Sequence, residues 1–480
     1  MSLKQKGACL YNLLGFRAFK LDLSCRKERV KMLRRSALLV LLLVLFTALL
    51  STAVVAQDGE ITLNVIGFVV PLEEQGTPLD QAYQQFIADF EAAHPGVKIN
   101  ALQTPPEFDT QLLVDLAAGT APDVWSQDAS TLARLIDSGY VLDMNECLAL
   151  VPEFDTDRFF DSVLAIHQRE EGGPIYGVPN DFTPMVIYYS TKALERAGVE
   201  PPQAGWTWDE FVEYAKLVTL DANGNNAASP DFDPNNVVQW GFRVRKWTFE
   251  WIYRLWQNGG DVIAPDGSTA SGYLDSPESI EAITWLRDLV TVHKVAPPPD
   301  TLSQMLQQLG FLDRFLLGDF AMFDRGHWEL VGLRANQNYE PGAFGVVGQP
   351  QNVARATVLY ESSFVIRADI PEEKKLAACQ FVAAATDRGY QDTKVLTGIA
   401  ISGNRAAAEA AIEQSFDPVL EQAFFDEVEF GRPPYGSIYA NWPTIEELLD
   451  SMMERILAGG DVETEVATAV REINRELSRR

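Results

Sequence analysis

Two stretches decide the fold class: ITLNVI over residues 61–66, and TPLDQAYQQFIADFEAAHPGVKI over residues 77–99. Apolar and polar side chains alternate in the first stretch, which predicts a β-strand. In the second, Thr77 can cap a helix over 78–93, where apolar residues recur at helical spacing. The segment from His94 to Gly96 ends that helix, and a short strand follows. The two stretches together therefore predict a strand–helix–strand unit.

The same alternation continues along the chain. Working outward, we expect helices and strands in the order helix Asp109–Ala118, strand Pro122–Trp125 leading to Asp128, helix Ser130–Ser138, and strands Met185–Tyr189, Ala321–Phe323 and Phe344–Val347. Further expected elements are a helix opened by a Thr207–Glu210 capping box, a surface loop over Asp221–Asn235, and helices over Phe249–Asn258, Pro277–His293 and Pro443–Leu477. Strands that alternate with helices predict an α/β fold with mainly parallel sheets.

The first 56 residues have the pattern of an export signal. A basic segment, Met32–Arg35, precedes an apolar run from Ala37 to Leu50, and small residues follow up to Ala56. This predicts a signal peptide cleaved after Ala56 and a translation start at Met32. An uncleaved anchor helix is the alternative, but the apolar run is short for a bilayer span. The protein is therefore expected outside the cytoplasm.

Charge and length limit the classes of function. Residues 1–56 hold ten Lys or Arg and two Asp or Glu, so residues 57–480 carry a net charge of −36. Such a surface repels nucleic acid and anionic membranes, and no nucleic-acid role is expected. A chain of 480 residues should divide into at least two domains. Cys147 and Cys379 lie in helix-like stretches and favour two buried thiols, with a single disulfide left open.

Sequence patterns of catalysis and of metal or nucleotide binding are missing. The chain has no Gly-rich phosphate loop with a Lys, no His-Glu-x-x-His, no Cys pair at zinc spacing and no Gly-x-Ser-x-Gly. A carboxylate pair for glycoside hydrolysis is possible among so many acids, but no local pattern singles one out. We therefore predict no catalytic residues, no metal and no cofactor.

Several segments occur in the order found in one protein family. They are Phe90–Val97 (FEAAHPGV), Leu116–Val124 (LAAGTAPDV), Tyr176–Pro179 with Tyr188–Leu194, Trp206–Phe211, Asn258–Asp261, and Gly318–Met322 with Gly326–Trp328. This series resembles the family 1 extracellular solute-binding proteins, the maltose-binding-protein-like receptors of ABC importers. The resemblance covers about residues 61–477, with Ser190-Thr191 where the family usually has Asn.

The resemblance implies a type II-like periplasmic-binding-protein fold. Two α/β lobes would be joined by a hinge and would close on a ligand in the cleft between them. We expect an N-terminal lobe of 57–178 plus 360–402 and a C-terminal lobe of 179–357 plus 403–480. The chain would cross between the lobes near Pro179, Leu359 and Ser402.

The physics of sugar recognition selects candidate ligand-binding residues. A sugar offers an apolar face for an aromatic ring and hydroxyl groups for fixed acceptors and donors. The resemblance places a stacking ring at Trp328, and Asp128 follows a strand at its carboxyl end, where α/β folds bind ligands. The full set of candidates is Phe68, Asp128, Asp181, Arg245, Trp247, Trp328, Tyr360, Glu361 and Trp442, with Arg432 as a weaker one. Each has a structural alternative: a core ring, a helix cap or a solvated charge.

The resemblance implies binding without chemistry. A monomeric exported protein would capture a sugar and deliver it to ABC permease subunits in the membrane. The alternatives are a receptor for a polyamine or a metal complex, an exported carbohydrate-active enzyme, and a structural surface protein.

Overall fold

The computed structural model describes residues 60–170, 172–415 and 417–479. The predicted signal peptide, its cleavage after Ala56 and the start at Met32 lie outside these residues. No helix within the described ranges has the length and apolar character needed to cross a membrane.

The first of two sheets has the strand order β11-β4-β10-β3-β1-β2, and β12 pairs with β10 outside that path. Its strands are β1 (Ile61–Ile66), β2 (Val97–Leu102), β3 (Val124–Asp128), β4 (Val178–Pro184), β10 (Thr357–Ile366), β11 (Ile401–Ser402) and β12 (Gly431–Arg432). β1 pairs in parallel with β2 and β3, whereas β10 runs antiparallel to β3 and β4. The long strand β10 therefore joins the parallel part of the sheet to β4.

The second sheet has the order β6-β7-β8-β5-β9. Its strands are β5 (Val186–Ser190), β6 (Leu220–Asp221), β7 (Val237–Phe242), β8 (Phe320–Arg325) and β9 (Phe344–Val347). β5 is antiparallel to both β8 and β9, and β7 is parallel to β8. The prediction of mainly parallel sheets is therefore wrong, because strands that return from distant segments pair antiparallel in both sheets.

Helices cover the first sheet and follow the predicted strand–helix alternation. They are α3 (Pro78–Ala93), α4 (Phe108–Ala118), α5 (Ala129–Asp137), α6 (Asn145–Leu150), α7 (Asp161–Leu164), α16 (Glu372–Ala385), α17 (Arg388–Val395) and α18 (Arg405–Gln414). The helices expected over 78–93, 109–118 and 130–138 agree with α3, α4 and α5 to within one residue. Thr77 caps α3 by accepting a hydrogen bond from the Asp80 amide at 3.3 Å. Phe86 and Phe90 of α3 pack with Phe381 of α16 in the core beneath β1.

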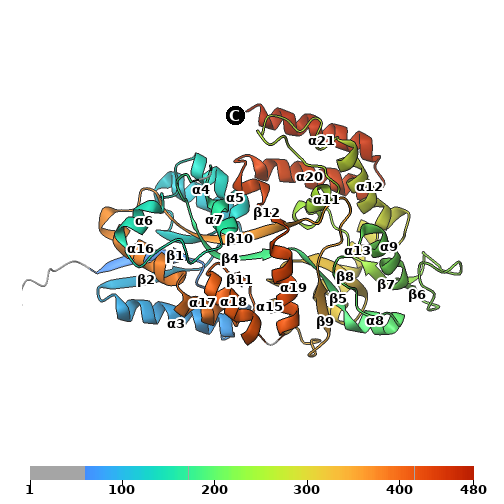
Figure 1. Ribbon diagram of the computed structural model, residues 1–480, viewed down its shortest axis with the longest axis horizontal. Helices are drawn as coiled ribbons and strands as arrows, with labels where there is room; N and C mark the ends of the chain where they lie inside the picture. The colour runs from blue at the N-terminus through green and yellow to red at the C-terminus, as the bar shows by residue number, and fades with distance from the viewer. Residues whose placement is uncertain (1–59, 171, 416, 480) are drawn as a thin grey trace, which may run out of the picture. The chain divides into compact units, whose positions relative to one another are not determined.

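The remaining helices surround the second sheet or stack beside it. They are α8 (Thr191–Ala197), α9 (Trp208–Leu217), α10 (Thr248–Trp251), α11 (Tyr253–Gln257), α12 (Pro277–Thr291), α13 (Pro299–Gln308), α14 (Phe311–Leu316), α15 (Glu329–Ala335), α19 (Pro418–Val428), α20 (Trp442–Leu457) and α21 (Val462–Leu477). Figure 1 shows α20 and α21 next to α12, and their apolar faces share one large core. The predicted Thr207–Glu210 capping box opens α9.

One predicted helix is divided in the structure, and the last helical stretch consists of two helices. The helix expected over Phe249–Asn258 is split at Ile252 into α10 and α11. The stretch Pro443–Leu477, predicted to be helical, forms the two helices α20 and α21, which meet where Gly459 takes a φ of +105°. That left-handed backbone is one that glycine adopts without strain.

A disulfide joins Cys147 of α6 to Cys379 of α16. The favoured prediction of two buried thiols is therefore wrong. Both residues do lie in buried helical positions, as expected, but α6 packs directly on α16 and brings the two sulfurs together. The sequence places the cysteines 232 residues apart and gives no sign of this contact.

The chain passes between the two sheets at few points. Only Met185 separates β4 of the first sheet from β5 of the second. The chain returns to the first sheet at β10, whose residues Thr357 and Val358 pair with β12 before Leu359 begins to pair with β4. The lobe boundaries given above stay a prediction.

Candidate functional site

A cavity of about 380 Å³ lies between β10, α10, α11 and the start of α20. Six aromatic side chains line it: Phe249, Trp256, Trp328, Tyr360, Tyr435 and Trp442. Asp128, at the end of β3, and Glu446, one turn into α20, add two carboxylates. A concave, mostly aromatic surface with a few polar groups is the usual form of a small-molecule site.

A second cavity of about 490 Å³ shares Asp128, Trp328 and Tyr360 with the first. Among its other lining residues are Asp181 of β4 and Glu361 of β10. Because the two cavities share three lining residues, we treat them as one space, called the cleft below. The cleft lies where β3, β4 and β10 of the first sheet meet the helices beside the second.

Six of the nine predicted ligand-binding residues line the cleft: Asp128, Asp181, Trp328, Tyr360, Glu361 and Trp442. Both interpretations offered for Asp128 apply, because its carboxylate faces the cleft and also caps α5. It accepts hydrogen bonds from the Ser130 amide at 2.7 Å and from the Ser130 hydroxyl at 2.5 Å.

The other three predicted residues lie elsewhere. Phe68 is 3% exposed and packs among the rings of Tyr83, Phe86, Phe364 and Phe381, so its side chain belongs to the core beneath β1. The bend that follows β1 turns this ring inward.

Arg245 and Trp247 line a separate cavity of about 510 Å³ beside α13. The Arg245 guanidinium lies 5.5 Å from the Trp247 ring and also pairs with Glu250, so both residues belong to that separate surface. The weaker candidate Arg432 pairs with Asp261 at 3.1 Å, and its guanidinium lies 4.3 Å from the centre of the Trp256 ring.

Among the aromatic and acidic residues that line the 380 Å³ cavity, sequence reasoning missed four: Phe249, Trp256, Tyr435 and Glu446. One signal for Glu446 was available, because it lies four residues after Trp442 and so shares a helix face with it. Phe249 and Trp256 sit on α10 and α11, whose division at Ile252 no pattern indicated. Tyr435 lies in the short 3-10 helix η4 (Tyr435–Ser437), which the sequence did not suggest.

The six aromatic rings that line the 380 Å³ cavity, called the aromatic wall below, are held rigidly. The rings of Tyr435 and Trp442 stack at 4.5 Å with an interplanar angle of 15°, and Trp328 meets Tyr360 at 6.2 Å and 68°. The Tyr360 hydroxyl donates to the Phe249 carbonyl at 3.2 Å, and the Tyr435 hydroxyl accepts from the Trp256 indole at 2.8 Å. Because these polar ends are already bonded, the rings are fixed in place. Trp256, Tyr435 and Trp442 are buried, whereas Phe249, Trp328 and Tyr360 are half-buried and present surface to the cavity.

Desolvation shapes the charge of the cleft. Asp128 is open to the cleft, yet the protein around it desolvates its carboxyl and raises its pKa in spite of the two hydrogen bonds from Ser130. Burial raises the pKa of Glu361 to about 7, although His167, 3.1 Å away, lowers it. Burial also raises the pKa of Glu446 to about 7, and the negative charges of Asp450 and Asp128 add to the effect. The cleft therefore holds carboxyl groups that lack full charge compensation.

Asp181 is the exception, because it has a cationic partner. Its carboxylate contacts the Lys394 ammonium and accepts from the Ser362 hydroxyl at 2.7 Å. Lys394 also donates to the Asn180 side chain at 2.6 Å. Asp181 is thus part of a bonded network at the floor of the cleft.

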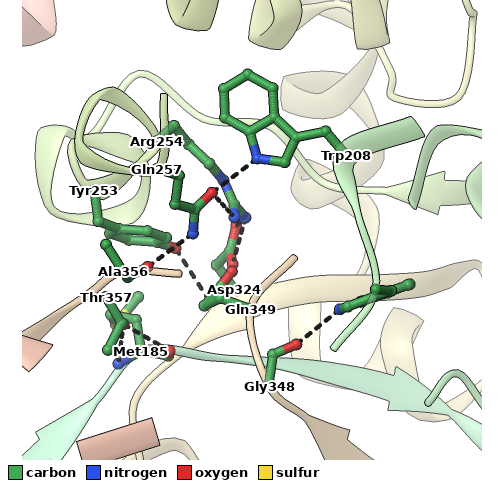
Figure 2. A network of polar contacts seen from close by, with 11 residues as sticks. Met185, Trp208, Tyr253, Arg254, Gln257, Asp324, Gly348, Gln349, Ala356 and Thr357 are labelled. Atoms are coloured by element: carbon green, nitrogen blue, oxygen red, sulfur yellow. Dashed lines mark hydrogen bonds and ion pairs between the residues drawn. The ribbon is translucent and has the colours of Figure 1, made fainter. Parts of the chain in front are cut away.

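A buried polar network supports the wall from behind (Figure 2). Arg254 of α11 donates to both oxygens of Asp324 in β8, at 3.1 and 3.2 Å, and to Gln257 at 3.0 Å. Gln257 in turn bonds the Trp208 indole and the Ala356 carbonyl. The network ties α11, which carries Trp256, to β8, which leads to Trp328. Within the part of the chain that the structure describes, no cluster of three or more His, Cys, Asp or Glu could hold a metal.

Comparisons with known proteins agree on one family. The sequence profile described as bacterial extracellular solute-binding protein matches residues 85–415. The chain is 24% identical over 255 residues to the Escherichia coli periplasmic-binding protein YcjN, a match covering 52% of this chain and 54% of that relative. It is 26% identical over 192 residues to the arabinooligosaccharide-binding protein of Halalkalibacterium halodurans, covering 40% and 38%. The chain thus matches about half, or less, of the length of these curated relatives.

Solved structures agree on the fold. The ABC substrate-binding protein Lmo0181 from Listeria monocytogenes, in complex with cycloalternan, superposes with a TM-score of 0.73 at 22% identity. The superposition covers 87% of this chain and 99% of that structure. At this level of identity the similarity establishes a shared two-lobed α/β fold and nothing finer.

Proposed function

Because the chain belongs to the bacterial extracellular solute-binding proteins, we propose that it is the receptor of an ABC importer and captures a saccharide in the cleft. The observation that carries the proposal is the aromatic wall, in which six rings line a cavity that also contains carboxylates. Ring faces stack on the apolar faces of pyranoses, and carboxylates accept hydrogen bonds from hydroxyl groups. Relatives named for arabinooligosaccharides and a structural neighbour in complex with cycloalternan support this choice.

The other parts of the proposal concern location, partners and chemistry. The protein would be exported, with its signal peptide removed near Ala56, and would deliver the ligand to permease subunits as a monomer. The ligand would leave unchanged, since the protein would bind it without turnover. Asp128, Trp328, Tyr360 and Trp442 would make the main contacts in the wall, and Asp181 and Glu361 would lie at the floor.

Ligand binding before and after removal of one ring tests the proposal. The purified protein is unfolded and refolded to release bound ligand, and a panel of mono-, di- and oligosaccharides is screened by thermal shift and then by calorimetry. At a hundred times its dissociation constant, a ligand stabilises the protein by about 2.7 kcal/mol. Trp328→Ala should weaken binding of the selected sugar about tenfold or more, as loss of a central aromatic contact does.

Trp247→Ala is the matched control, because Trp247 is 38% exposed and lines the separate cavity beside α13. It should bind the sugar as the unmodified protein does. Equal loss in both variants, or no saccharide binding at all, would contradict the proposal. Recovery of hydrolysed sugar would favour a carbohydrate-active enzyme instead.

A further inference from the structure

The side chains that line the cleft carry charges of one sign. Six lining residues are acidic: Glu74, Asp109, Asp128, Asp181, Glu361 and Glu446. None of the described residues that line either cavity is Lys or Arg. An anionic ligand, such as a phosphate ester, would be repelled by these carboxylates and would find no cationic side chain in the described lining. The negative charge of the cleft therefore favours a neutral or a cationic ligand over an anionic one.

Some of these carboxylates already have partners within the protein. Asp181 contacts the Lys394 ammonium, and Glu361, 3% exposed, faces the His167 ring at 3.1 Å. No described residue offers a well-directed hydrogen bond to either oxygen of Glu361. A buried carboxylate at the floor of a ligand cleft thus has the His167 ring as its one close polar neighbour among the described residues.

Asp128 and Glu446 have even less compensation. The contacts of Asp128 come from Ser130, which is neutral, and no described residue forms a hydrogen bond or an ion pair with Glu446. They approach the same 380 Å³ cavity from different elements, Asp128 from the end of β3 and Glu446 from α20. Burial raises the pKa of Tyr360, which lines the same cavity, and the negative charges of Glu446 and Asp128 raise it further. Two uncompensated carboxylates in an aromatic cavity carry a desolvation cost that a positive charge would relieve.

The rings of the wall would also attract a cation. Aromatic faces carry partial negative charge and bind ammonium groups that lie over them. Two of the rings already have an arginine nearby: the guanidinium of Arg325 lies 5.4 Å from Phe249, and that of Arg432 lies 4.3 Å from Trp256. Trp328, Tyr360 and Trp442 have no such neighbour among the described residues. Trp442 is 3% exposed and stacks on Tyr435, so the half-buried rings of Trp328 and Tyr360 are the ones open to a ligand.

We infer that the ligand is a saccharide bearing at least one protonated amine, whose ammonium group is held between Asp128 and Glu446. This inference rests on the proposed function and adds a charge to the ligand. The aromatic wall takes the apolar faces of the sugar rings, and the two carboxylates take the ammonium. Ammonium–carboxylate hydrogen bonds are roughly twice as strong as neutral ones, so the amine would dominate selectivity.

Matched pairs of sugars test the inference. Glucosamine, galactosamine, mannosamine and glucosamine di- to tetramers are each compared with the N-acetylated form, which has the same rings without the charge. Calorimetry at low and moderate salt gives the dissociation constants. We expect the free amines to bind about tenfold or more tightly than the acetylated forms, because a charge-assisted bond is lost on acetylation. The preference should shrink as salt rises.

Three variants identify the carboxylates responsible. Glu446→Gln and Asp128→Asn should each reduce the preference for the free amine to a few-fold or less, and Asn retains the capping role at α5. Glu447→Gln is the control, since this exposed glutamate is the next residue of α20 and does not line the cleft. It should keep the full preference.

The results that would contradict the inference, the assigned site or the proposed function differ from one another. Equal affinity for both members of every pair, or a preference for neutral sugars, would overturn this inference and leave the proposed function standing. A preference that survives both Glu446→Gln and Asp128→Asn would overturn the assigned site. Spermidine binding without any saccharide binding would overturn the inference and the proposed function together.

Discussion

The guanidinium of Arg254 is completely buried and depends on Asp324 for its charge compensation. Arg254→Met would leave the Asp324 carboxylate buried without a cation. Removing one partner of such a pair costs about 3–5 kcal/mol. We therefore expect a loss of that size in the free energy of unfolding, measured by chemical denaturation.

The double variant Arg254→Met/Asp324→Leu provides the control. With both charges removed, much of the stability should return, because no lone charge remains in the core. A single variant as stable as the unmodified protein, or a double variant less stable than the single one, would show that the pair does not have this role.

Residues near strand ends were predictable, and residues after bends were not. Asp128 ends a buried strand, so its position along the chain was enough to predict it at the cleft, whereas Trp328, which follows β8, was predicted from the family resemblance. Phe68 also follows a strand, but a two-residue bend turns its ring into the core. Side-chain direction after a bend depends on backbone angles that residue type alone does not determine. The same reason separates Trp247 from the cleft, although Phe249, two residues on, lines it.

Among the elements, η4 makes an unusually close approach to α5. A Cβ atom on Gly436 would lie 1.5 Å from the Ser130 carbonyl oxygen, so only glycine fits there. The two elements carry Tyr435 on one side and Ser130, the partner of Asp128, on the other. Gly436→Ala should force them apart and weaken ligand binding about tenfold or more, since small displacements of a wall disrupt many contacts at once. Calorimetry with the selected ligand measures the effect.

Gly389→Ala is a suitable comparison. The nearest neighbour of a Cβ atom on Gly389 would be the Asp387 carboxylate at 3.5 Å, which is an ordinary contact distance. Gly389 lies in α17, where alanine favours the helix, so affinity should be unchanged. Equal affinities for the Gly436 variant and the unmodified protein would mean that η4 and α5 tolerate separation.

Helix positions were largely predictable, and strand partners were not. Caps such as Thr77 and Thr207 are encoded within a few residues, so α3 and α9 start where the sequence indicated. The direction in which β10 pairs with β3 and β4 depends on segments far apart in the chain, and local patterns carry no information about it. The sequence therefore predicted more parallel strand pairing than the structure has.

For the whole molecule, the carboxyl groups of the cleft make stability depend on pH. Glu361 and Glu446 have pKa values of about 7 in the folded protein against 4.5 for an ordinary glutamate. Between these values the folded state holds protons that the unfolded chain has released, so stability falls as pH rises. The contribution is complete below about pH 4.5 and is lost as pH passes through about 7. Unfolding of the ligand-free protein should therefore require less denaturant at pH 8 than at pH 5.5.

Glu446→Gln should flatten this pH dependence, because a glutamine cannot lose a proton. Glu447→Gln again serves as the comparison and should leave the slope unchanged. A Glu446 variant with the slope of the unmodified protein would show that the unfolding equilibrium is not linked to this group.

The family and the two-lobed α/β class could be predicted for the whole molecule, since an ordered series of short motifs runs from residue 61 to residue 477. The contact between α6 and α16 could not be predicted, because nothing in the local sequence of either helix specifies the other as its partner. The disulfide between Cys147 and Cys379 was not predicted for the same reason.

The bond between Cys147 and Cys379 closes a loop that contains about half of the chain. Thiols stay reduced in the cytosol and become oxidised outside it, so on the proposed export the same polypeptide would carry free thiols before it crosses the membrane and the disulfide afterwards. Electrophoresis without reductant would distinguish the two forms, and so the compartment in which a molecule folded, because a closed loop changes the mobility of the chain. Protein produced in a reducing cytoplasm would be an open-loop form whose stability says little about the receptor in its working compartment.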